Sequence, residues 1–444
     1  MKLFVRCYVR QLSGLVASEL CRGKPEKNSG SYLEKIFYHE ALSLALRKER
    51  ERWRMRDKGA DAVKKLMFVF ITTVLIAIGL STSVVRAQTS RWTEQKANAW
   101  YAQQPWLVGS NYVPKSAINQ LEMWQEGSFD PSQIETEFAW AEAMGMNTMR
   151  VFLHDLLWQQ DAAGFQKRID RFLAIAARHH IRPMLVLFDS CWDPLPHLGP
   201  QHPPIPGVHN SGWVQSPGAT ALADAKQYPR LRAYVQGVVG AFAKDDRILA
   251  WDVWNEPGSD NAGSYPKEEL KVNDKIARVA ALLPQAFQWA REANPVQPLT
   301  SGVWSVDTSD GEDLGELQRI QLRESDIITF HNYSWPEYFK REVAWLKKYN
   351  RPVICTEYMA RSVGSTFDGV LPIAKQERVG AINWGFVAGK TQTYFPWESW
   401  QHPYIRDQPP VWFHEVLRPD GTPYRQAEVD LIRHLTGKNA ALGN

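Results

Sequence analysis

Two glutamates stand at the ends of apolar, β-rich segments that are far apart in the chain. Glu256 follows the run 248–255 and precedes Pro257, while Glu357 lies near the end of the run 352–358. Because proline cannot continue a central ladder, the first strand should stop where Glu256 emerges. Barrel enzymes keep their reactive side chains at the carboxyl ends of buried parallel strands. The two glutamates are therefore candidates for one shared reactive site.

Two carboxyl groups in different surroundings can act as a proton donor and a nucleophile. Cleavage of a glycosidic bond requires a proton on the leaving oxygen and a negative group that faces the oxocarbenium-like centre. Arg150 near Glu357 would favour its charge, whereas the apolar Trp251 and Trp254 would disfavour charge on Glu256. We expect the carboxyl separation of ~5–5.5 Å found in retaining pairs, rather than the ~6.5–9.5 Å of inverting pairs.

The elements that would position these groups alternate regularly from residue 106 onward. Strands are expected at 106–113, 146–153, 182–188, 248–254, 298–304, 326–333, 352–358 and 380–387, and the helices that follow them at 132–144, 164–179, 228–243, 274–293, 314–323, 336–349, 369–377 and 426–435. Eight right-handed βαβ repeats of this length predict a (β/α)8 TIM barrel. An open doubly wound sheet would require a glycine-rich phosphate turn after the first strand, and residues 109–112 do not form one.

Long loops are expected after strands 3 and 8. They cover 189–227 and 388–423, and both lie on the face that carries barrel active sites. Long connections without elements of their own are usually functional. They could wall a cleft or close one of its ends.

Polar or aromatic side chains end six of the eight expected strands. They are Arg150, His154 and Asp155 on strand 2, Asp189 on strand 3, Asn255 and Glu256 on strand 4, His331, Asn332 and Tyr333 on strand 6, Glu357 on strand 7 and Trp384 on strand 8. Each residue alone could serve packing or a structural ion pair. Their combination at one rim indicates an active site.

This set of residues resembles a retaining glycoside hydrolase of clan A and is most similar to the cellulase-like family 5. The resemblance covers about 92–437, and its most specific part is the pair of glutamates on strands 4 and 7. It implies that Glu256 is the acid/base, that Glu357 is the nucleophile and that Asn255 binds the sugar 2-hydroxyl. The remaining implied roles concern the walls of the site: Arg150 pairs with the nucleophile, His331 and Tyr333 hold the carboxyls in their charge states, and Trp384 floors the subsite before the cut.

One position departs from that family. A histidine usually follows strand 3, but this chain has Asp189 and Ser190 there. Asp189, or His154 from strand 2, would occupy the space that this histidine fills in the family. The departure leaves the subfamily and the substrate open.

Softer candidates lie in the loops above the barrel. Tryptophan faces complement the apolar face of a pyranose, so sugar stacking and packing under loops are both open for Trp192, Trp213, Trp304, Trp335, Trp397 and Trp400. Lys390 and Gln392 could reach a sugar hydroxyl or carboxylate, or could belong to a solvated turn. Arg361 is similarly placed just past the second glutamate.

Composition excludes several other classes of protein. The formal net charge is only +4, and its excess lies in the first 65 residues, so we expect no nucleic-acid partner. Cys191 and Cys355 should lie on opposite sides of the barrel and remain free thiols, and Cys7 and Cys21 precede the body of the chain. Because the cysteines and histidines lack metal-site spacing, we expect no metal and no cofactor.

The amino-terminal region differs from the rest. Residues 1–65 are basic and weakly patterned, and 66–87 contain an uncharged apolar run after Lys64 and Lys65. We favour a signal peptide cleaved after Ala87, with translation starting at Met55 or Met67; a membrane anchor is the alternative. In either case we expect the body to be exported, to the periplasm or the extracellular space.

The sequence thus predicts a monomeric, exported retaining β-glycosidase that acts on a β-linked oligosaccharide or polysaccharide. The alternatives are a transglycosylase, which uses the same residues, and a non-hydrolytic carbohydrate-binding barrel, which would be expected to lack a carboxylate. Glucan, mannan and xylan all remain open as substrates, as does the choice between endo and exo action.

Overall fold

The computed structural model describes residues 90–261, 263–265, 272–304 and 314–438. Contacts divide the chain into two units, 1–85 and 86–444, and the described residues belong to the second. The predicted extension, the apolar run 66–87, Cys7 and Cys21 lie outside the described residues. Among the residues described, none of the helices has the length and apolarity that a membrane crossing requires.

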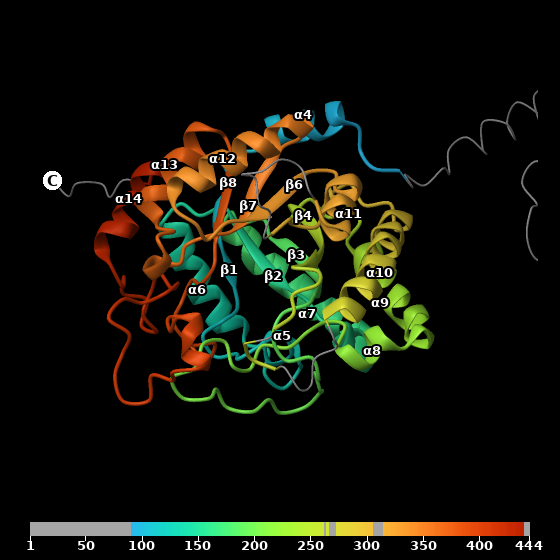
Figure 1. Ribbon diagram of the computed structural model, residues 1–444, viewed down its shortest axis with the longest axis horizontal. Helices are drawn as coiled ribbons and strands as arrows, with labels where there is room; N and C mark the ends of the chain where they lie inside the picture. The colour runs from blue at the N-terminus through green and yellow to red at the C-terminus, as the bar shows by residue number, and fades with distance from the viewer. Residues whose placement is uncertain (1–89, 262, 266–271, 305–313, 439–444) are drawn as a thin grey trace, which may run out of the picture. The chain divides into compact units, whose positions relative to one another are not determined.

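Eight parallel strands form the barrel (Figure 1). They are β1 Val108–Tyr112, β2 Thr148–Phe152, β3 Met184–Asp189, β4 Ala250–Asn255, β5 Leu299–Thr300, β6 Ile328–His331, β7 Val353–Glu357 and β8 Gly380–Asn383. Their order is β5-β4-β3-β2-β1-β8-β7-β6. A parallel bridge between Val303 and Phe330 joins the two ends, and His331 N donates to Val303 O over 3.0 Å. The predicted (β/α)8 fold is confirmed.

Helices surround the strands in the expected sequence. The eight that follow the strands are α6 Pro131–Ala143, α7 Asp155–Arg178, α9 Tyr228–Ala241, α10 Val272–Glu292, α11 Glu316–Glu324, α12 Pro336–Leu346, α13 Phe367–Gln376 and α14 Gln426–Thr436. Three further α-helices in the part of the chain that the structure describes are α4 Glu94–Ala102, α5 Gln120–Trp124 and α8 Ala219–Ala223. Local chemistry sets the helix ends. For example, Asp130 accepts hydrogen bonds from the amides of Ser132 and Gln133 at the start of α6.

Helix α7 is longer than predicted. It begins at Asp155 because His154 caps it: His154 Nδ1 accepts from Leu156 N at 3.1 Å. A kink at Asp161, which has non-helical backbone angles, separates the first turns from the segment predicted as 164–179. The periodicity beyond the kink was visible in the sequence, whereas the capped first turns were not.

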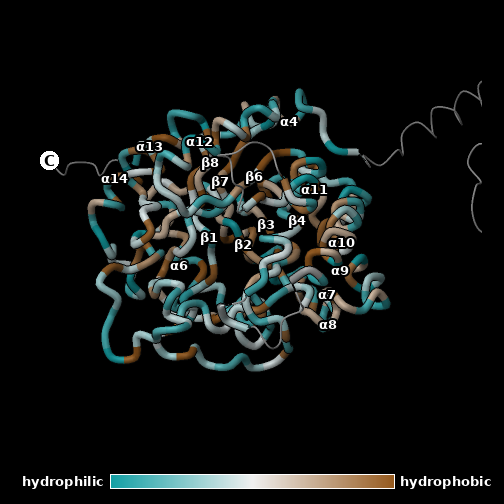
Figure 2. Tube along the Cα trace, in the orientation of Figure 1, coloured by the Kyte–Doolittle hydropathy of each residue, from teal (hydrophilic) through white to brown (hydrophobic). Residues whose placement is uncertain are grey.

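The strands are buried along their whole length, as their continuous apolar runs predict for a parallel sheet covered on both faces. A separate apolar cluster contains Trp92 and residues at or next to the starts of strands, Leu107, Met184, Leu249 and Ile327 among them. In Figure 2 hydrophilic and hydrophobic residues alternate along the outer helices, as amphipathic helices on a core require. The carboxyl ends of the strands are consequently held on a rigid base.

Candidate active site

The two predicted glutamates lie close together at the carboxyl end of the barrel. An oxygen of Glu256, an oxygen of Glu357 and a ring nitrogen of His331 lie within 4.8 Å of one another. Glu256 has φ of 40°, in the left-handed region, which costs ~1–3 kcal/mol for a residue other than glycine. The fold tolerates this strain at the position where β4 turns its carboxyl group toward β7.

Glu357 is held by charged and polar donors. Arg150 Nη1 donates to Glu357 Oε1 at 2.8 Å, and the Tyr333 hydroxyl donates to Oε2 at 2.7 Å. Arg150 is fully buried, and its Nη2 contacts Asp252 at 2.8 Å and donates to Asn255 Oδ1 at 2.7 Å. These bonds fix the guanidinium so that it stabilises the ionised form of Glu357.

Glu256 has only neutral donors in direct contact. The Cys191 thiol donates to Oε2 over 3.2 Å, and His331 Nδ1 lies 2.8 Å from Oε1. Burial lowers the pKa of His331 to about 4, so its ring is neutral near pH 7. Its Nε2 has no hydrogen-bond partner. The neutral ring therefore carries its hydrogen on Nδ1 and donates it to Glu256.

The two carboxyls share one cavity but have different neighbours. Burial raises the pKa of Glu256, and burial together with the charge of Glu256 raises that of Glu357. Arg150 lowers both pKa values, and Tyr333 lowers that of Glu357. Because the guanidinium and the phenol contact Glu357 directly, they favour the ionised form of this carboxyl more than that of Glu256. This arrangement could let Glu256 donate a proton while Glu357 carries a negative charge.

Asp189 lies beneath the site and orients Asn255. Asn255 Nδ2 donates to Asp189 Oδ1 at 2.9 Å, and Trp213 Nε1 donates to Asp189 Oδ2 at 2.6 Å. Burial raises the pKa of Asp189 to about 6. Asp189, which stands where the family usually has a histidine, therefore holds the amide of Asn255 in place.

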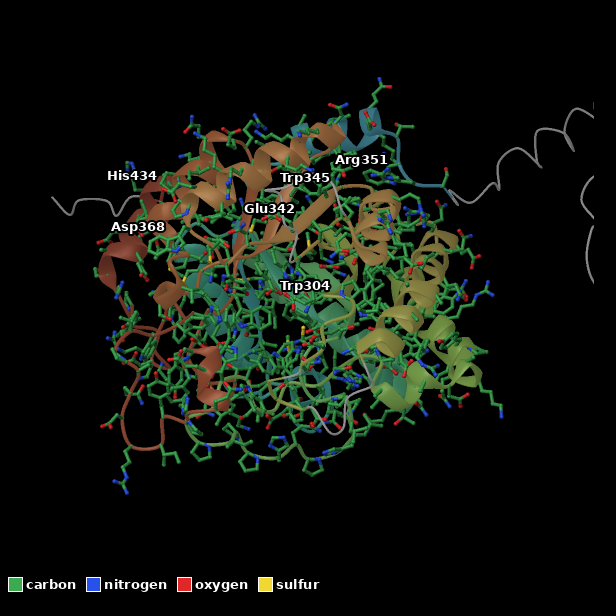
Figure 3. All side chains as sticks on the ribbon, viewed as in Figure 1. Trp304, Glu342, Trp345, Arg351, Asp368 and His434 are labelled. Carbon is green, nitrogen blue, oxygen red and sulfur yellow. The ribbon has the colours of Figure 1, made fainter. Side chains whose placement is uncertain are left out.

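A cavity of about 470 Å³ opens above the two glutamates. Both carboxylates, Asn255, Tyr333 and Cys191 line it. So do six tryptophans: Trp192, Trp213, Trp304, Trp384, Trp397 and Trp400. Trp304 is labelled near the middle of the ribbon in Figure 3. Acidic and amide groups surrounded by flat apolar rings are the surfaces that a sugar needs.

Several predicted residues do not line the cavity. His154 is fully buried as the cap of α7, and Lys390 pairs with Glu122. Arg361 pairs with Glu428, and Trp335 is 60% exposed. Gln392 Nε2 donates to the carbonyl of Ile205 at 2.7 Å. Apart from the exposed Trp335, these side chains hold loops and helix ends in the structure.

Other residues of the site were not anticipated from the sequence. Asn111 Oδ1 accepts from Arg150 Nη1 at 2.9 Å, and Asp252 pairs with the same guanidinium. The expectation that Cys191 is a free thiol is confirmed, but its burial and its contact with Glu256 were not predicted. Asn111 is a polar residue near the end of the first strand, and Asp252 is a charged residue within an otherwise apolar strand. Both features can be read from the sequence.

Glu256, His331 and Glu357 also have donor atoms close enough together to hold a metal ion. Among the residues that the structure describes, this is the group that meets that criterion. The positive charge of Arg150 contacts Glu357 at 2.8 Å. A cation at this position would be repelled by the guanidinium. The surroundings fit an acid and a nucleophile better than a metal centre.

Comparisons with known proteins support a glycoside hydrolase barrel. Residues 207–309, which contain Asn255 and Glu256, match the family model described as Glycosyl hydrolase family 10. GH5_18 from Streptomyces cattleya in complex with GlcNAc has a TM-score of 0.51 and 13% identity over 76% of this chain and 81% of that chain. A variant of the same protein in complex with Manβ1-4GlcNAc has a TM-score of 0.50 and 12% identity, and the match covers 76% of this chain and 82% of that chain. No curated protein matches the chain.

The partial match to family 10 and the solved family 5 barrels agree with the resemblance to clan A that the residues indicated. At 12–13% identity the solved structures establish the fold. The roles of individual residues rest on the geometry of this site.

The thiol of Cys191 should influence the pKa of Glu256. Its hydrogen bond stabilises the carboxylate of Glu256, so Cys191→Ala is expected to raise the pKa of Glu256. Cys191→Ser supplies a stronger donor and is expected to lower it. The alkaline limb of the kcat/KM profile should move in opposite directions in the two variants, each by on the order of half a pH unit.

The matched control is Cys355→Ala. This change removes another buried free thiol, one that donates to the backbone carbonyl of Glu357 rather than to a side-chain carboxylate. The alkaline limb should stay in place. Equal shifts in the alanine and serine variants of Cys191 would contradict the assigned hydrogen bond.

Proposed function

We propose that this protein is a glycoside hydrolase that cleaves a β-linked glycoside with retention of configuration. The observation that carries the proposal is the asymmetric pair of glutamates in one cavity. Glu357 contacts a buried guanidinium and a phenol, whereas Glu256 contacts a neutral thiol and imidazole. The approach within 4.8 Å supports the short separation of a retaining pair.

The first step forms a glycosyl-enzyme. A carboxylate oxygen of Glu357 attacks the anomeric carbon as the bond from that carbon to the leaving oxygen breaks. Glu256 gives its proton to the leaving oxygen. Arg150 and Tyr333 keep Glu357 ionised before the attack.

The second step releases the sugar. Glu256, now a carboxylate, takes a proton from water, and the oxygen of that water attacks the anomeric carbon. The ester bond to Glu357 breaks, and its carboxylate is restored. Two inversions give net retention. Asn255, fixed by Asp189 and Arg150, would hydrogen-bond the sugar 2-hydroxyl, and Trp384 would floor the subsite before the cut.

The substrate class is a β-linked glycoside, oligosaccharide or polysaccharide. The two solved structures reported above hold GlcNAc and Manβ1-4GlcNAc, so β-mannosides belong in the first substrate panel beside glucosides, xylosides and N-acetylglucosaminides. We further propose that the body of the chain acts after export, as a monomer, and that the run 66–87 is removed after Ala87.

The test is hydrolysis of aryl β-glycosides and of β-glucan, mannan and xylan chains of several linkages by the full chain, followed by proton NMR. We expect cleavage of at least one series, with the β anomer of the product appearing first. An α anomer formed first would contradict retention. Binding without cleavage would favour the carbohydrate-binding barrel, and products longer than the substrate would favour the transglycosylase.

A further inference from the structure

We infer that the cavity encloses one terminal sugar at the non-reducing end of the substrate, so that the enzyme acts on chain ends. This inference rests on the proposed function and specifies its substrate. It depends on three features: two loops that are joined into a wall, a blocked space behind Trp384, and buried polar groups that lack protein partners.

The loops after β3 and β8 form one wall. Hydrogen bonds join them at five places: His209 N to Ser399 Oγ at 2.8 Å, His209 Nδ1 to Phe395 O at 2.7 Å, Asn210 N to Thr391 O at 2.8 Å, Tyr404 N to Gly207 O at 3.0 Å and Gln392 Nε2 to Ile205 O at 2.7 Å. Bonds to backbone groups of this kind resist opening by side-chain rotation alone. The wall is a fixed part of the cavity.

Aromatic rings extend the wall to the loop after β4. Trp192 stacks on Trp400, with ring centroids 5.6 Å apart and an angle of 13°. Tyr265 packs against Trp400 at 5.1 Å and donates its hydroxyl hydrogen to Ser211 O. Three loops thus meet above the barrel, which an open groove for a long polymer would not require.

The space behind the expected sugar floor is closed. Trp384 packs against Trp213 and Phe152, with ring centroids 5.8 Å apart in each pair. The next cavity, beyond these rings and beside Asn111 on β1, has a volume of only about 20 Å³. A sugar that lies on Trp384 cannot continue into a second sugar on that side. Because the leaving group departs on the side of Glu256, the blocked side is the non-reducing one.

Unpaired polar groups in the wall point to what is bound there. Asn210 is fully buried, and neither atom of its amide has a hydrogen-bond partner. The same holds for Nε2 of His414 and Nε1 of Trp400. All three residues line the cavity. Buried polar groups need partners, and sugar hydroxyls can both donate and accept.

The unpaired groups of His414, Trp400 and Asn210 differ in whether they can donate or accept a hydrogen bond. His414 Nδ1 donates to Met359 O at 2.5 Å, so its Nε2 is an acceptor. Trp400 Nε1 can only donate, and the amide of Asn210 does both. A ring of hydroxyls on one terminal sugar can satisfy this combination. We therefore assign Asn210, His414 and Trp400 to recognition of that sugar.

The decisive experiment compares two forms of one substrate. A β-linked tetrasaccharide, of the sugar and linkage that the panel identifies, is offered free and with its non-reducing sugar capped by an acetal across two hydroxyls. We expect the free form to lose single sugars from that end and the capped form to resist cleavage. Internal cleavage of the capped form would overturn the inference and leave the proposed function intact. If neither a tetrasaccharide nor any aryl glycoside is cleaved, the proposed function fails, and the inference fails with it.

Asn210→Ala provides a second test. Loss of the amide should lower kcat/KM on the aryl glycoside about ten- to hundredfold, with little change in melting temperature. The control is Asn294→Ala, because Asn294 also has a positive φ, 54° against 48° for Asn210, but is exposed. The control should keep full activity. Equal losses in both variants, or no loss in Asn210→Ala, would overturn the assignment of Asn210 to the sugar.

Discussion

Replacement of Glu357 by alanine is expected to lower kcat/KM by about 10⁴-fold or more. The change removes the group that would bond to the anomeric carbon, and Asp252, which shares Arg150 with Glu357, is not free to take its place. Asp252 is tied to Arg150 by two hydrogen bonds, from Nε at 3.0 Å and Nη2 at 2.8 Å. The variant leaves Arg150 without one anionic partner, so its melting temperature must be measured beside its activity.

Added azide distinguishes loss of the nucleophile from loss of the fold, because an unfolded Glu357→Ala variant cannot form a glycosyl azide. With Glu357→Ala, the vacated space admits azide, which attacks the anomeric carbon once, while Glu256 still donates its proton. The product should be an α-glycosyl azide, whose configuration is set by one inversion. A β-glycosyl azide would contradict the assignment of Glu357 as the nucleophile.

Glu137→Gln is a suitable control for these variants. Glu137 on α6 is a buried glutamate, and burial raises its pKa to about 7. Its carboxyl accepts a hydrogen bond from the hydroxyl of Tyr112 on β1, and it does not line the cavity. We expect its variant to keep its activity. A loss as large as that in Glu357→Ala would indicate that removing any buried carboxylate damages the fold.

The sequence was sufficient for the barrel because short buried strands alternate with helices, and several of these strands, β3 and β4 among them, are largely apolar and stop at a polar residue. Residues such as Asn255, Glu256 and Glu357 were identified by that rule, since the rim of a parallel barrel converges. The rule depends only on local pattern and on topology. It therefore placed the residues on β2, β4, β6 and β7 in one site.

Loop residues could not be placed in the same way. Lys390 was a candidate for sugar binding, but the fold pairs it with Glu122 on α5, whose position follows from contacts distant in the sequence. Nothing in the sequence marks Asn210 or His414 as a site residue, because their burial depends on how two long loops meet. The route of a loop is set by tertiary contacts, which sequence periodicity does not contain.

Replacement of Glu256 by glutamine should have an effect that depends on the leaving group. For substrates with poor leaving groups, kcat/KM should fall by about 10²- to 10⁴-fold, the usual contribution of a general acid. For a dinitrophenyl glycoside, which departs without a proton, the first step should proceed nearly as in the wild type. The glycosyl-enzyme should then accumulate as a burst, because the second step has lost its base.

The pH dependence of this variant follows from the same assignment. Burial raises the pKa of Glu256, so the acid is protonated below that pKa, and activity on poor leaving groups is lost as the pH rises through it. Glutamine cannot titrate, so the alkaline limb of kcat/KM should disappear while the acid limb, which reports ionisation of Glu357, remains. Azide should accelerate turnover of the dinitrophenyl glycoside and yield a β-glycosyl azide after two inversions. An unchanged alkaline limb, or an α product, would assign the proton donor to another residue.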